Sequence, residues 1–239
     1  MLDKNITTML FDLDGTLLPM ELESFTNTYF KLLAKQAAPY GYEPEALVAA
    51  VWKGTKAMIQ NDGTRPNDRR FWEVFASELG DAVLDLRPVF DRFYANGFNG
   101  ARTATRENPL AKKAVEAAKK AGLTVILATN PLFPAAGVAT RLSWIGLYPE
   151  DFAYVTSYEN CSYCKPNPLY YTQLLERTGR VSGECLMIGN DVREDALAAS
   201  KAGLCAYLIT DCLENAQDDD ISGIDHGSFE EFMKFAGLE

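Results

Sequence analysis

Short apolar runs, each typical of a strand buried in a parallel sheet, recur along the chain. Between the later runs, apolar residues recur at the spacing of a helix with one buried face. This alternation of strands and helices predicts an α/β fold, a Rossmann-like doubly wound parallel sheet. The predicted strands are residues 7–11, 123–128, 152–155, 185–188 and 205–209, and the predicted helices between them are residues 109–121, 133–145, 168–177 and 192–202.

The stretch after the first predicted strand interrupts this rhythm, because it contains helical patterns and no convincing strand pattern. Phe71 and Phe75 illustrate the helical spacing of its apolar residues. We therefore expect a mainly α-helical domain at residues 19–104, inserted into a core α/β domain formed by residues 1–18 and 105–239. The helices predicted within the insertion are residues 25–38, 45–56, 69–79 and 89–94.

The composition is that of a globular protein, since 47% of the 239 residues are hydrophobic and 23% are charged. Lys and Arg number 23 against 33 Asp and Glu, which gives a net charge of -10 at pH 7. This negative surplus repels polyanions, so nucleic acid and anionic membrane surfaces are not expected partners. No apolar run approaches the roughly 20 residues of a membrane span and no signal peptide is visible, so we expect a cytoplasmic protein. The sequence pattern does not specify its oligomeric state.

The five cysteines are an odd number without the spacing of a disulfide framework, which favours reduced thiols. Cys161 and Cys164 form a CxxC, but no second CxxC or paired histidine accompanies them to complete a zinc site. His226 is the sole histidine and no GxSxG is present, so a serine hydrolase triad is not expected.

Two carboxylates follow the first predicted strand directly, in the sequence Asp-Leu-Asp-Gly-Thr. Asp12 and Asp14 lie two residues apart on chain leaving a strand and can project toward one site, while Gly15 permits a sharp turn. One carboxylate can attack phosphorus as a nucleophile, and the other can give a proton to the leaving oxygen and later take one from water. A polar turn without chemistry is the alternative interpretation.

Two further polar positions lie next to predicted strands and helices. Thr129 and Asn130 follow the second predicted strand, and Lys165 precedes a predicted helix. The Thr129 hydroxyl can donate to a phosphoryl oxygen, and the Lys165 ammonium can offset charge on a phosphate and on a nucleophilic carboxylate. Helix capping by Thr129 and a solvated Lys165 are the alternatives.

The fourth predicted strand is followed by an acidic cluster that contains Asn190, Asp191 and Asp195. More acid beside Asp12 and Asp14 is repulsive unless a cation lies among them. Because Mg²⁺ prefers oxygen ligands completed by water and substrate phosphate, the cluster predicts a magnesium site. Helix capping by Asp191 can operate alongside this role.

These four positions, in this order, resemble the motifs of the haloacid dehalogenase-like hydrolase superfamily. The resemblance covers the whole chain apart from the insertion, whose place between the first and second motifs fits the helical cap of that family. The matching motifs are DxDGT at Asp12 to Thr16, a threonine that ends a strand at Thr129, a lysine before a helix at Lys165, and an acidic motif at Gly189 to Asp195.

The resemblance implies a role for each matching residue. Asp12 is implied as the nucleophile, Asp14 as the general acid and base, and Lys165 as the cation that balances charge. Thr129 is implied as a phosphate ligand, with Asn130 beside it. Mg²⁺ is implied to contact Asp12, the backbone carbonyl of Asp14 and the fourth motif.

The fourth motif departs from the usual family forms, GDxxxD and GDxxxxD. Asp191 with Asp195 satisfies the shorter form if Asn190 replaces Gly, and Asn190 with Asp195 satisfies the longer form if Asn replaces Asp. We favour Asp191 as the metal ligand because an anion binds Mg²⁺ better than an amide. Asn190 is then a neighbour or substitute, and Asp195 orients Lys165 or a metal-bound water.

Asp14 also helps to choose the reaction. Dehalogenases of this superfamily have no Asp at that position, since halide leaves without a proton, whereas an alkoxide needs one. We therefore expect a phosphoric monoester hydrolase that acts on a small phosphorylated metabolite through a phosphoaspartate. The alternatives are a phosphomutase, a phosphonate-cleaving relative that uses Lys53 or Lys56, a receiver-like signalling module in which the phosphate is a message, and a silent binding protein.

Overall fold

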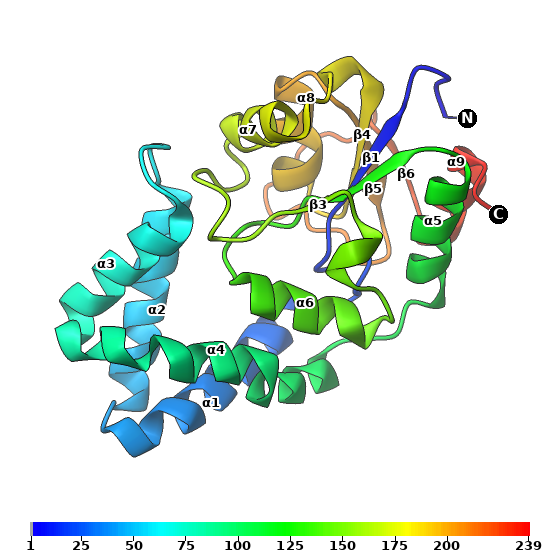
Figure 1. Ribbon diagram of the computed structural model, residues 1–239. Coiled ribbons are helices and arrows are strands. Elements are labelled where there is room, and N and C mark those ends of the chain that lie inside the picture. Colours follow the sequence, from blue (N-terminus) through cyan, green and yellow to red (C-terminus); the bar gives the residue numbers. More distant parts are fainter. Residues whose placement is uncertain (1) are drawn as a thin grey trace.

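The computed structural model describes residues 2–239 and contains one fully parallel sheet of six strands (Figure 1). The strand order is β3-β2-β1-β4-β5-β6, so β1 lies at the centre and the chain returns to its other side at β4. This confirms the predicted α/β fold with a doubly wound parallel sheet. The strands are β1 (Thr8–Phe11), β2 (Thr124–Leu127), β3 (Tyr154–Val155), β4 (Cys185–Gly189), β5 (Cys205–Ile209) and β6 (Asp225–Gly227).

Helices cover both faces of the sheet, and alternate residues of each strand contact opposite layers. In β1, Phe11 joins the apolar cluster that includes Val115 of α5 and Phe232 of α9. Leu10 instead joins the cluster formed with Tyr171 and Leu174 of α7. The α-helices of this part of the chain are α5 (Pro109–Lys120), α6 (Ala135–Trp144), α7 (Pro168–Thr178), α8 (Ala198–Lys201) and α9 (Phe229–Ala236).

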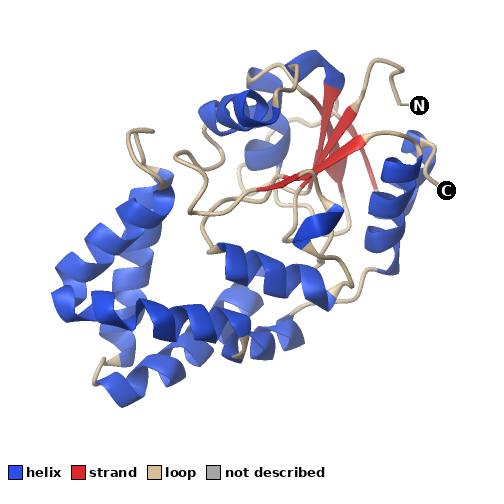
Figure 2. Ribbon diagram, in the orientation of Figure 1, coloured by secondary structure: helices blue, strands red, loops and turns tan. Residues whose placement is uncertain are grey.

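Four α-helices between β1 and α5 form a separate layer beyond the sheet, which we call the helical segment (Figure 2). Aromatic side chains join it to α6: Phe98 stacks on Phe133 with ring centroids 5.9 Å apart and lies 5.5 Å from Trp144. The segment consists of α1 (Leu22–Ala37), α2 (Pro44–Ile59), α3 (Asn67–Leu79) and α4 (Arg87–Ala95), with the 3-10 helices η1 (Ala38–Tyr40), η2 (Asp81–Leu86) and η3 (Gly97–Ala104).

Besides these aromatic contacts, backbone hydrogen bonds tie the helical segment to the rest of the chain. Where the chain enters and leaves it, Met20 and Thr105 form an antiparallel bridge, and the Arg106 amide donates to the Pro19 carbonyl at 2.8 Å. The second tie is the start of α3, where the backbone amide of Asn67 donates to the Cys161 carbonyl at 2.8 Å.

Several elements differ in extent from the sequence prediction, and two were missed. The third strand is shorter than predicted, and the predicted helix at residues 192–202 is a π-helical turn η6 (Val192–Leu197) followed by α8. Strand β6 was missed because it is polar and lies at the edge of the sheet, where β5 pairs with it. Helix α9 was missed although its apolar residues recur at helical spacing and a capping box precedes it. No helix among residues 2–239 is long and apolar enough to cross a membrane.

Candidate active site

The candidate site lies at the carboxyl ends of β1, β2 and β4, where the strand order reverses around β1. Register pairs place Phe11 beside Leu127 on one side and beside Ile188 on the other, so the residues that follow these three strands leave the sheet together. A crevice at this edge is the usual ligand site of a doubly wound sheet. Asp12, Thr129 and Asn190 all follow these strand ends.

A buried chain of ion pairs runs through the centre of the site. The Nζ of Lys165 donates to Oδ1 of Asp12 at 2.9 Å and to Oδ1 of Asp195 at 2.6 Å. The side chain of Lys165 is fully buried, and Asp12 is only 6% exposed. The fold thus brings Lys165 into contact with Asp12, 153 positions before it, and with Asp195, 30 positions after it.

Burial and charge act in opposite directions on this chain. Burial alone would lower the pKa of Lys165, but the carboxylates of Asp12 and Asp195 hold that pKa well above its ordinary value. Burial raises the pKa of the Asp12 carboxyl; the Lys165 ammonium opposes this shift, and the charges of Asp195 and Asp14 add to it. One ammonium therefore serves two buried carboxylates, which leaves a surplus of negative charge for a cation to balance.

Asp195 connects Lys165 to the loop after β4. Its Oδ2 accepts hydrogen bonds from the backbone amides of Asn190 and Asp191, both at 3.0 Å, while Oδ1 accepts from Lys165. Gly189 makes this approach possible, because a Cβ there would lie 2.1 Å from Oδ2 of Asp195. The predicted contact between Asp195 and Lys165 is therefore present, and it also fixes the backbone of the fourth motif.

Asn190 packs against the Asp12–Thr16 turn. Its Oδ1 accepts a hydrogen bond from the Thr16 hydroxyl at 2.9 Å, and its Nδ2 donates to the Cys212 carbonyl at 2.8 Å. Gly15 has φ +84°, and a Cβ there would lie 2.4 Å from Asn190 Nδ2, so the turn needs glycine for conformation and for space. Of the two fourth-motif candidates, Asn190 is the one whose side chain touches the first motif.

Asp191 caps the helical turn that follows it. Its Oδ1 accepts from the backbone amides of Arg193 and Glu194, at 2.8 and 2.7 Å, as the capping alternative predicts. Burial raises the pKa of the Asp191 carboxyl, and burial raises the pKa of neighbouring Glu194 to about 7. Oδ1 of Asp191 therefore has a structural role as a helix cap, independent of any contact that Oδ2 makes.

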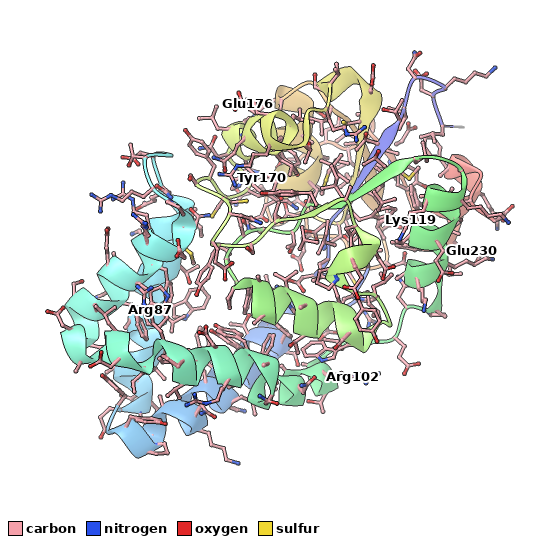
Figure 3. All side chains as sticks on the ribbon, in the orientation of Figure 1. Arg87, Arg102, Lys119, Tyr170, Glu176 and Glu230 are labelled. Atoms are coloured by element: carbon pink, nitrogen blue, oxygen red, sulfur yellow. The ribbon has the colours of Figure 1, made fainter. Side chains whose placement is uncertain are left out.

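Hydrogen bonds to neighbouring residues fix the positions of Thr129 and Asn130. The Thr129 carbonyl accepts from the Thr156 hydroxyl at 2.7 Å and from the Tyr170 hydroxyl at 3.0 Å. Tyr170 lies on the inner side of α7, toward the sheet, whereas Glu176 lies on its outer side (Figure 3). The Asn130 amide donates to Glu194 at 2.9 Å and to the Lys165 carbonyl at 3.3 Å, whereas its Oδ1 is buried without a hydrogen-bond partner.

Asp14 forms an ion pair with Arg141 of α6, a residue that the sequence analysis missed. The Arg141 side chain is fully buried, and its guanidinium lies over the Phe133 ring, 4.3 Å from the centroid. Asp14 is 25% exposed, and its Oδ1 is buried without a hydrogen-bond partner. A visible signal was available: Arg141 interrupts the apolar face of a predicted helix, since its buried neighbours on α6 are Val138, Leu142 and Trp144.

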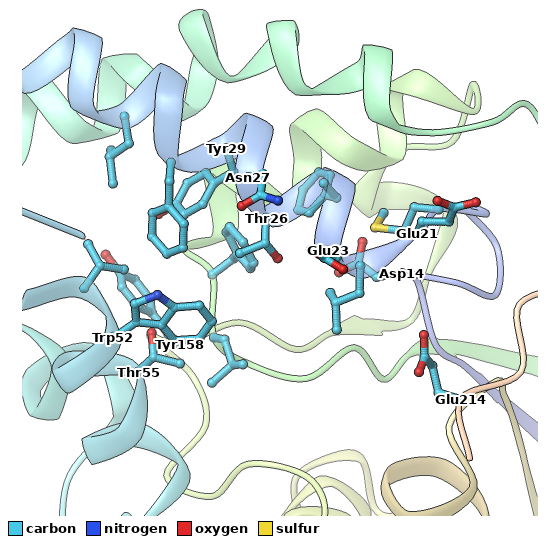
Figure 4. A pocket seen from close by; sticks show the side chains of 18 of the residues that line it. Asp14, Glu21, Glu23, Thr26, Asn27, Tyr29, Trp52, Thr55, Tyr158 and Glu214 are labelled. Atoms are coloured by element: carbon cyan, nitrogen blue, oxygen red, sulfur yellow. The ribbon is translucent and has the colours of Figure 1, made fainter. Parts of the chain in front are cut away.

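A cavity of about 1120 Å³ separates the sheet edge from the helical segment. Asp14 lies at one end of it, and Trp52 of α2 and Tyr158 lie at the other (Figure 4). This cavity is large enough for a drug-sized molecule, since such sites span about 300–1,000 Å³. Of the predicted site residues, Asp14 lines this cavity, which is bounded by both parts of the chain.

The remaining candidates lie outside this arrangement. Cys161 and Cys164 are buried free thiols, and burial raises the pKa of Cys161 to about 12. His226 is exposed on β6. Across residues 2–239, no three side chains of Asp, Glu, His or Cys come together as ligands of a metal ion. A magnesium ion at the Asp12 site thus depends on backbone or amide oxygens as well as carboxylates.

Known proteins resemble the chain over most of its length. A family model described as a haloacid dehalogenase-like hydrolase matches residues 6–203. A phosphoglycolate phosphatase of Vibrio parahaemolyticus is 29% identical over 215 residues, which cover 88% of this chain and 86% of the relative. A phosphoglycolate phosphatase of Agrobacterium fabrum is 25% identical over 201 residues, covering 84% and 79%.

Solved structures share the fold across both parts of the chain. A 2-haloacid dehalogenase from Pseudomonas syringae superposes with a TM-score of 0.63 at 20% identity, covering 97% of this chain and 98% of that one. A phosphatase of the same family from Thermococcus onnurineus gives a TM-score of 0.61 at 19% identity, covering 98% and 99%. These likenesses extend through the helical segment as well as the sheet.

Proposed function

Because the chain belongs to the haloacid dehalogenase-like hydrolase family, we propose that it is a magnesium-dependent phosphatase that works through a phosphoaspartate on Asp12. The relatives named as phosphatases support an activity that hydrolyses phosphate esters. The observation that carries the mechanism is the buried contact of Asp12 with Lys165, which Asp195 anchors. Two residues after Asp12, Asp14 lies at one end of the cavity.

In the first step an Asp12 oxygen attacks phosphorus, and the bond from phosphorus to the ester oxygen breaks. Asp14 gives its proton to the leaving alkoxide, so that an alcohol departs. In the second step Asp14 takes a proton from water, the water oxygen attacks phosphorus, and inorganic phosphate leaves with Asp12 regenerated. Lys165 stays charged through both steps, and together with the Thr129 hydroxyl it stabilises the equatorial oxygens.

The oxygens available at the site fit magnesium. Asp12 offers a carboxylate, Asp14 a backbone carbonyl, and the loop after β4 an oxygen of Asp191 or Asn190. Each candidate already has a hydrogen-bond partner, because Asn190 accepts from Thr16 and Asp191 caps η6. These contacts are consistent with magnesium being held by both residues. When bound, the ion supplies positive charge that draws the phosphate to the acidic site and stabilises the transferring group.

Residues 19–104 serve in this proposal as the helical cap of a core domain formed by residues 1–18 and 105–239. The antiparallel bridge between Met20 and Thr105 supports this boundary, because the two connecting segments run side by side there. The cap closes over the cavity and keeps bulk water from the phosphoaspartate until the alcohol has left. The substrate is a small phosphorylated metabolite that fits between the two parts.

The rival activities find less support. A phosphonate-cleaving enzyme needs a free lysine at the cavity, but Lys53 pairs with Glu78 on the surface at 2.6 Å and its side chain is 57% exposed. A receiver-like signalling module does not need a cavity of about 1120 Å³ between the sheet edge and a helical segment, with Asp14 in its lining. A phosphomutase shares the first step and differs only in the acceptor.

The test is hydrolysis of p-nitrophenyl phosphate by the full chain with Mg²⁺, with excess EDTA, and after Asp12→Asn. We expect turnover with Mg²⁺, restoration of lost activity when Mg²⁺ is added back after EDTA, and a fall of at least a thousandfold in Asp12→Asn. The matched control is Asp3→Asn, an exposed substitution outside the site.

Full activity of Asp12→Asn, or activity that EDTA leaves unchanged, would overturn the mechanism. Stoichiometric labelling by acetyl phosphate without turnover of any ester would instead favour the signalling module.

A further inference from the structure

We infer that the substrate is the phosphate monoester of an alcohol with a bulky apolar or aromatic group and no second anionic group. This inference rests on the proposed phosphatase function and names the substrate class of the same site. It departs from phosphoglycolate, whose small alcohol part carries a carboxylate.

The walls of the cavity that face away from the sheet are aromatic. Tyr29 and Phe30 of α1, Trp52 of α2 and Phe71 of α3 reach it from the helical segment, and Phe133 and Tyr158 reach it from the other side. The Phe30 and Trp52 rings lie 5.4 Å apart and tilted, and the Tyr29 and Phe133 rings lie 5.4 Å apart edge to face. Such a surface favours a flat or bulky apolar group.

Trp52 and Leu22 are the most informative of these residues, because their apolar surface remains uncovered. Trp52 is 54% exposed and Leu22 is 58% exposed, and both line the cavity. Large apolar side chains normally lie in the core, so their exposure at a cavity indicates a surface that a ligand covers.

The charges in the cavity oppose a second anion. Its lining includes five carboxylates, Asp14, Glu21, Glu23, Asp211 and Glu214, whose labelled members gather at the end opposite Trp52 (Figure 4). Arg106 is the single basic residue in the lining, and its guanidinium donates to the Cys212 sulfur at 3.2 Å. A substrate carboxylate would therefore lose hydration in a lining where five carboxylates outnumber one guanidinium.

Other cations near the cavity are already engaged. Arg141 is fully buried in its ion pair with Asp14, and the Arg87 guanidinium lies over the Trp72 ring, 4.7 Å from the centroid. Lys165 is buried between Asp12 and Asp195, where it serves the phosphoryl group. The one anionic part of the substrate is therefore its phosphate, and the remainder contacts rings and uncharged polar groups such as Thr26, Asn27 and Thr55.

The test compares three esters with similar alkoxide leaving groups: 2-phenylethyl phosphate, ethyl phosphate and phosphoglycolate. With saturating Mg²⁺ we expect kcat/KM for 2-phenylethyl phosphate to exceed the other two by at least tenfold. Trp52→Ala is expected to lower kcat/KM for 2-phenylethyl phosphate about tenfold and to leave that for ethyl phosphate within about twofold.

Tyr40→Ala is the matched control, since Tyr40 is 47% exposed in the same segment and does not line the cavity. It should leave all three values unchanged. Phosphoglycolate hydrolysed as fast as 2-phenylethyl phosphate, or a Trp52→Ala variant that loses both alkyl esters equally, would overturn the substrate class and leave the phosphatase standing. Failure of all three esters together with p-nitrophenyl phosphate would overturn both.

Discussion

In the ion pair of Asp14 with Arg141, a buried side chain holds the carboxylate that we propose as the general acid and base. Arg141 Nε also donates to the Gly137 carbonyl at 3.3 Å, while one of its terminal nitrogens has no hydrogen-bond partner. Burying a guanidinium in this way costs stability, since the charge loses its hydration and one donor stays unpaired. We interpret that cost as the consequence of a positioning role, in which Arg141 aims Asp14 toward the ester oxygen.

Arg141→Met is expected to lower kcat about tenfold to a hundredfold, because Asp14 loses its fixed orientation. The same variant should change the melting temperature little, since Asp14 is partly exposed and can be hydrated once Arg141 is gone. Steady-state kinetics and thermal unfolding measure the two effects separately.

Arg141→Lys provides the comparison for this prediction, because it keeps the charge and loses the planar fork. It should recover part of the activity. A purely structural role for Arg141 is indicated instead if Arg141→Met lowers stability by several kcal/mol while its folded fraction keeps full kcat.

At the scale of the elements, the turn between β4 and η6 shows how closely backbone and side chain must approach. Gly189 ends β4, and Asp195 of η6 folds back over it to reach the amides of Asn190 and Asp191. The π-helical form of η6 belongs to this same turn, and π-helical turns occur often at functional sites. The strand end, the turn and Lys165 are thus one connected unit.

Gly189→Ala is expected to destabilise the protein by about 1–3 kcal/mol and to lower kcat, because the added methyl displaces Asp195 and with it Lys165. Its Cβ would lie 2.2 Å from the Asp195 carboxyl carbon and 2.4 Å from its Cβ, so rotation of the carboxyl end cannot relieve the clash. Urea denaturation measures the free energy of unfolding.

Gly183→Ala is the matched control, since a Cβ there meets nothing within 4 Å. It should leave both stability and kcat near their original values. Equal unfolding free energies for the two variants would contradict the close approach of Asp195.

At the scale of the whole molecule, two ties act beside the aromatic contacts with α6 to hold the helical segment over the site. One is the bridge between the connecting segments at Met20 and Thr105. The other is Asn67, fully buried at the start of α3, whose Nδ2 donates to the Cys164 sulfur at 3.2 Å and whose Oδ1 accepts from Asn61 at 2.8 Å. Because Cys164 directly precedes Lys165, this second tie joins the helical segment to the loop that carries Lys165.

Asn67→Ala is expected to cost about 1–3 kcal/mol of stability, since it leaves a buried donor of Asn61 with one partner fewer and opens a small cavity. Amide hydrogen exchange should become faster in residues 61–67 and 158–164 together, because the two loops share this contact. Exchange around Met20 and Thr105 should stay the same.

The comparison variant is Asn96→Ala, an exposed asparagine in the same segment whose amide contacts only the Arg92 carbonyl. Faster exchange in one of the two loops alone would show that they are not coupled through Asn67.

Much of the core follows from local patterns. Buried parallel strands are apolar on both faces, so the runs at β1, β2, β4 and β5 were visible as strands, and the Asp, Thr, Lys and acidic positions beside strands and helices resembled one family in order. Exact ends were less predictable, because caps and short 3-10 turns depend on neighbours. Strand β6 was missed since a polar edge strand has no period to detect, whereas α9 carries an apolar period and a Ser228–Glu231 capping box that could have revealed it.

The sequence alone therefore determined the α/β class and the order of the motifs that resemble the family, because apolar runs and short motifs are local features of the chain. Only the tertiary structure decided that Arg141 holds Asp14, that Asp195 serves both Lys165 and the β4 turn, and that the cavity is aromatic with an acidic end. These features depend on side chains brought together across long sequence separations, and burial and pairing of charge exist only once the chain is packed.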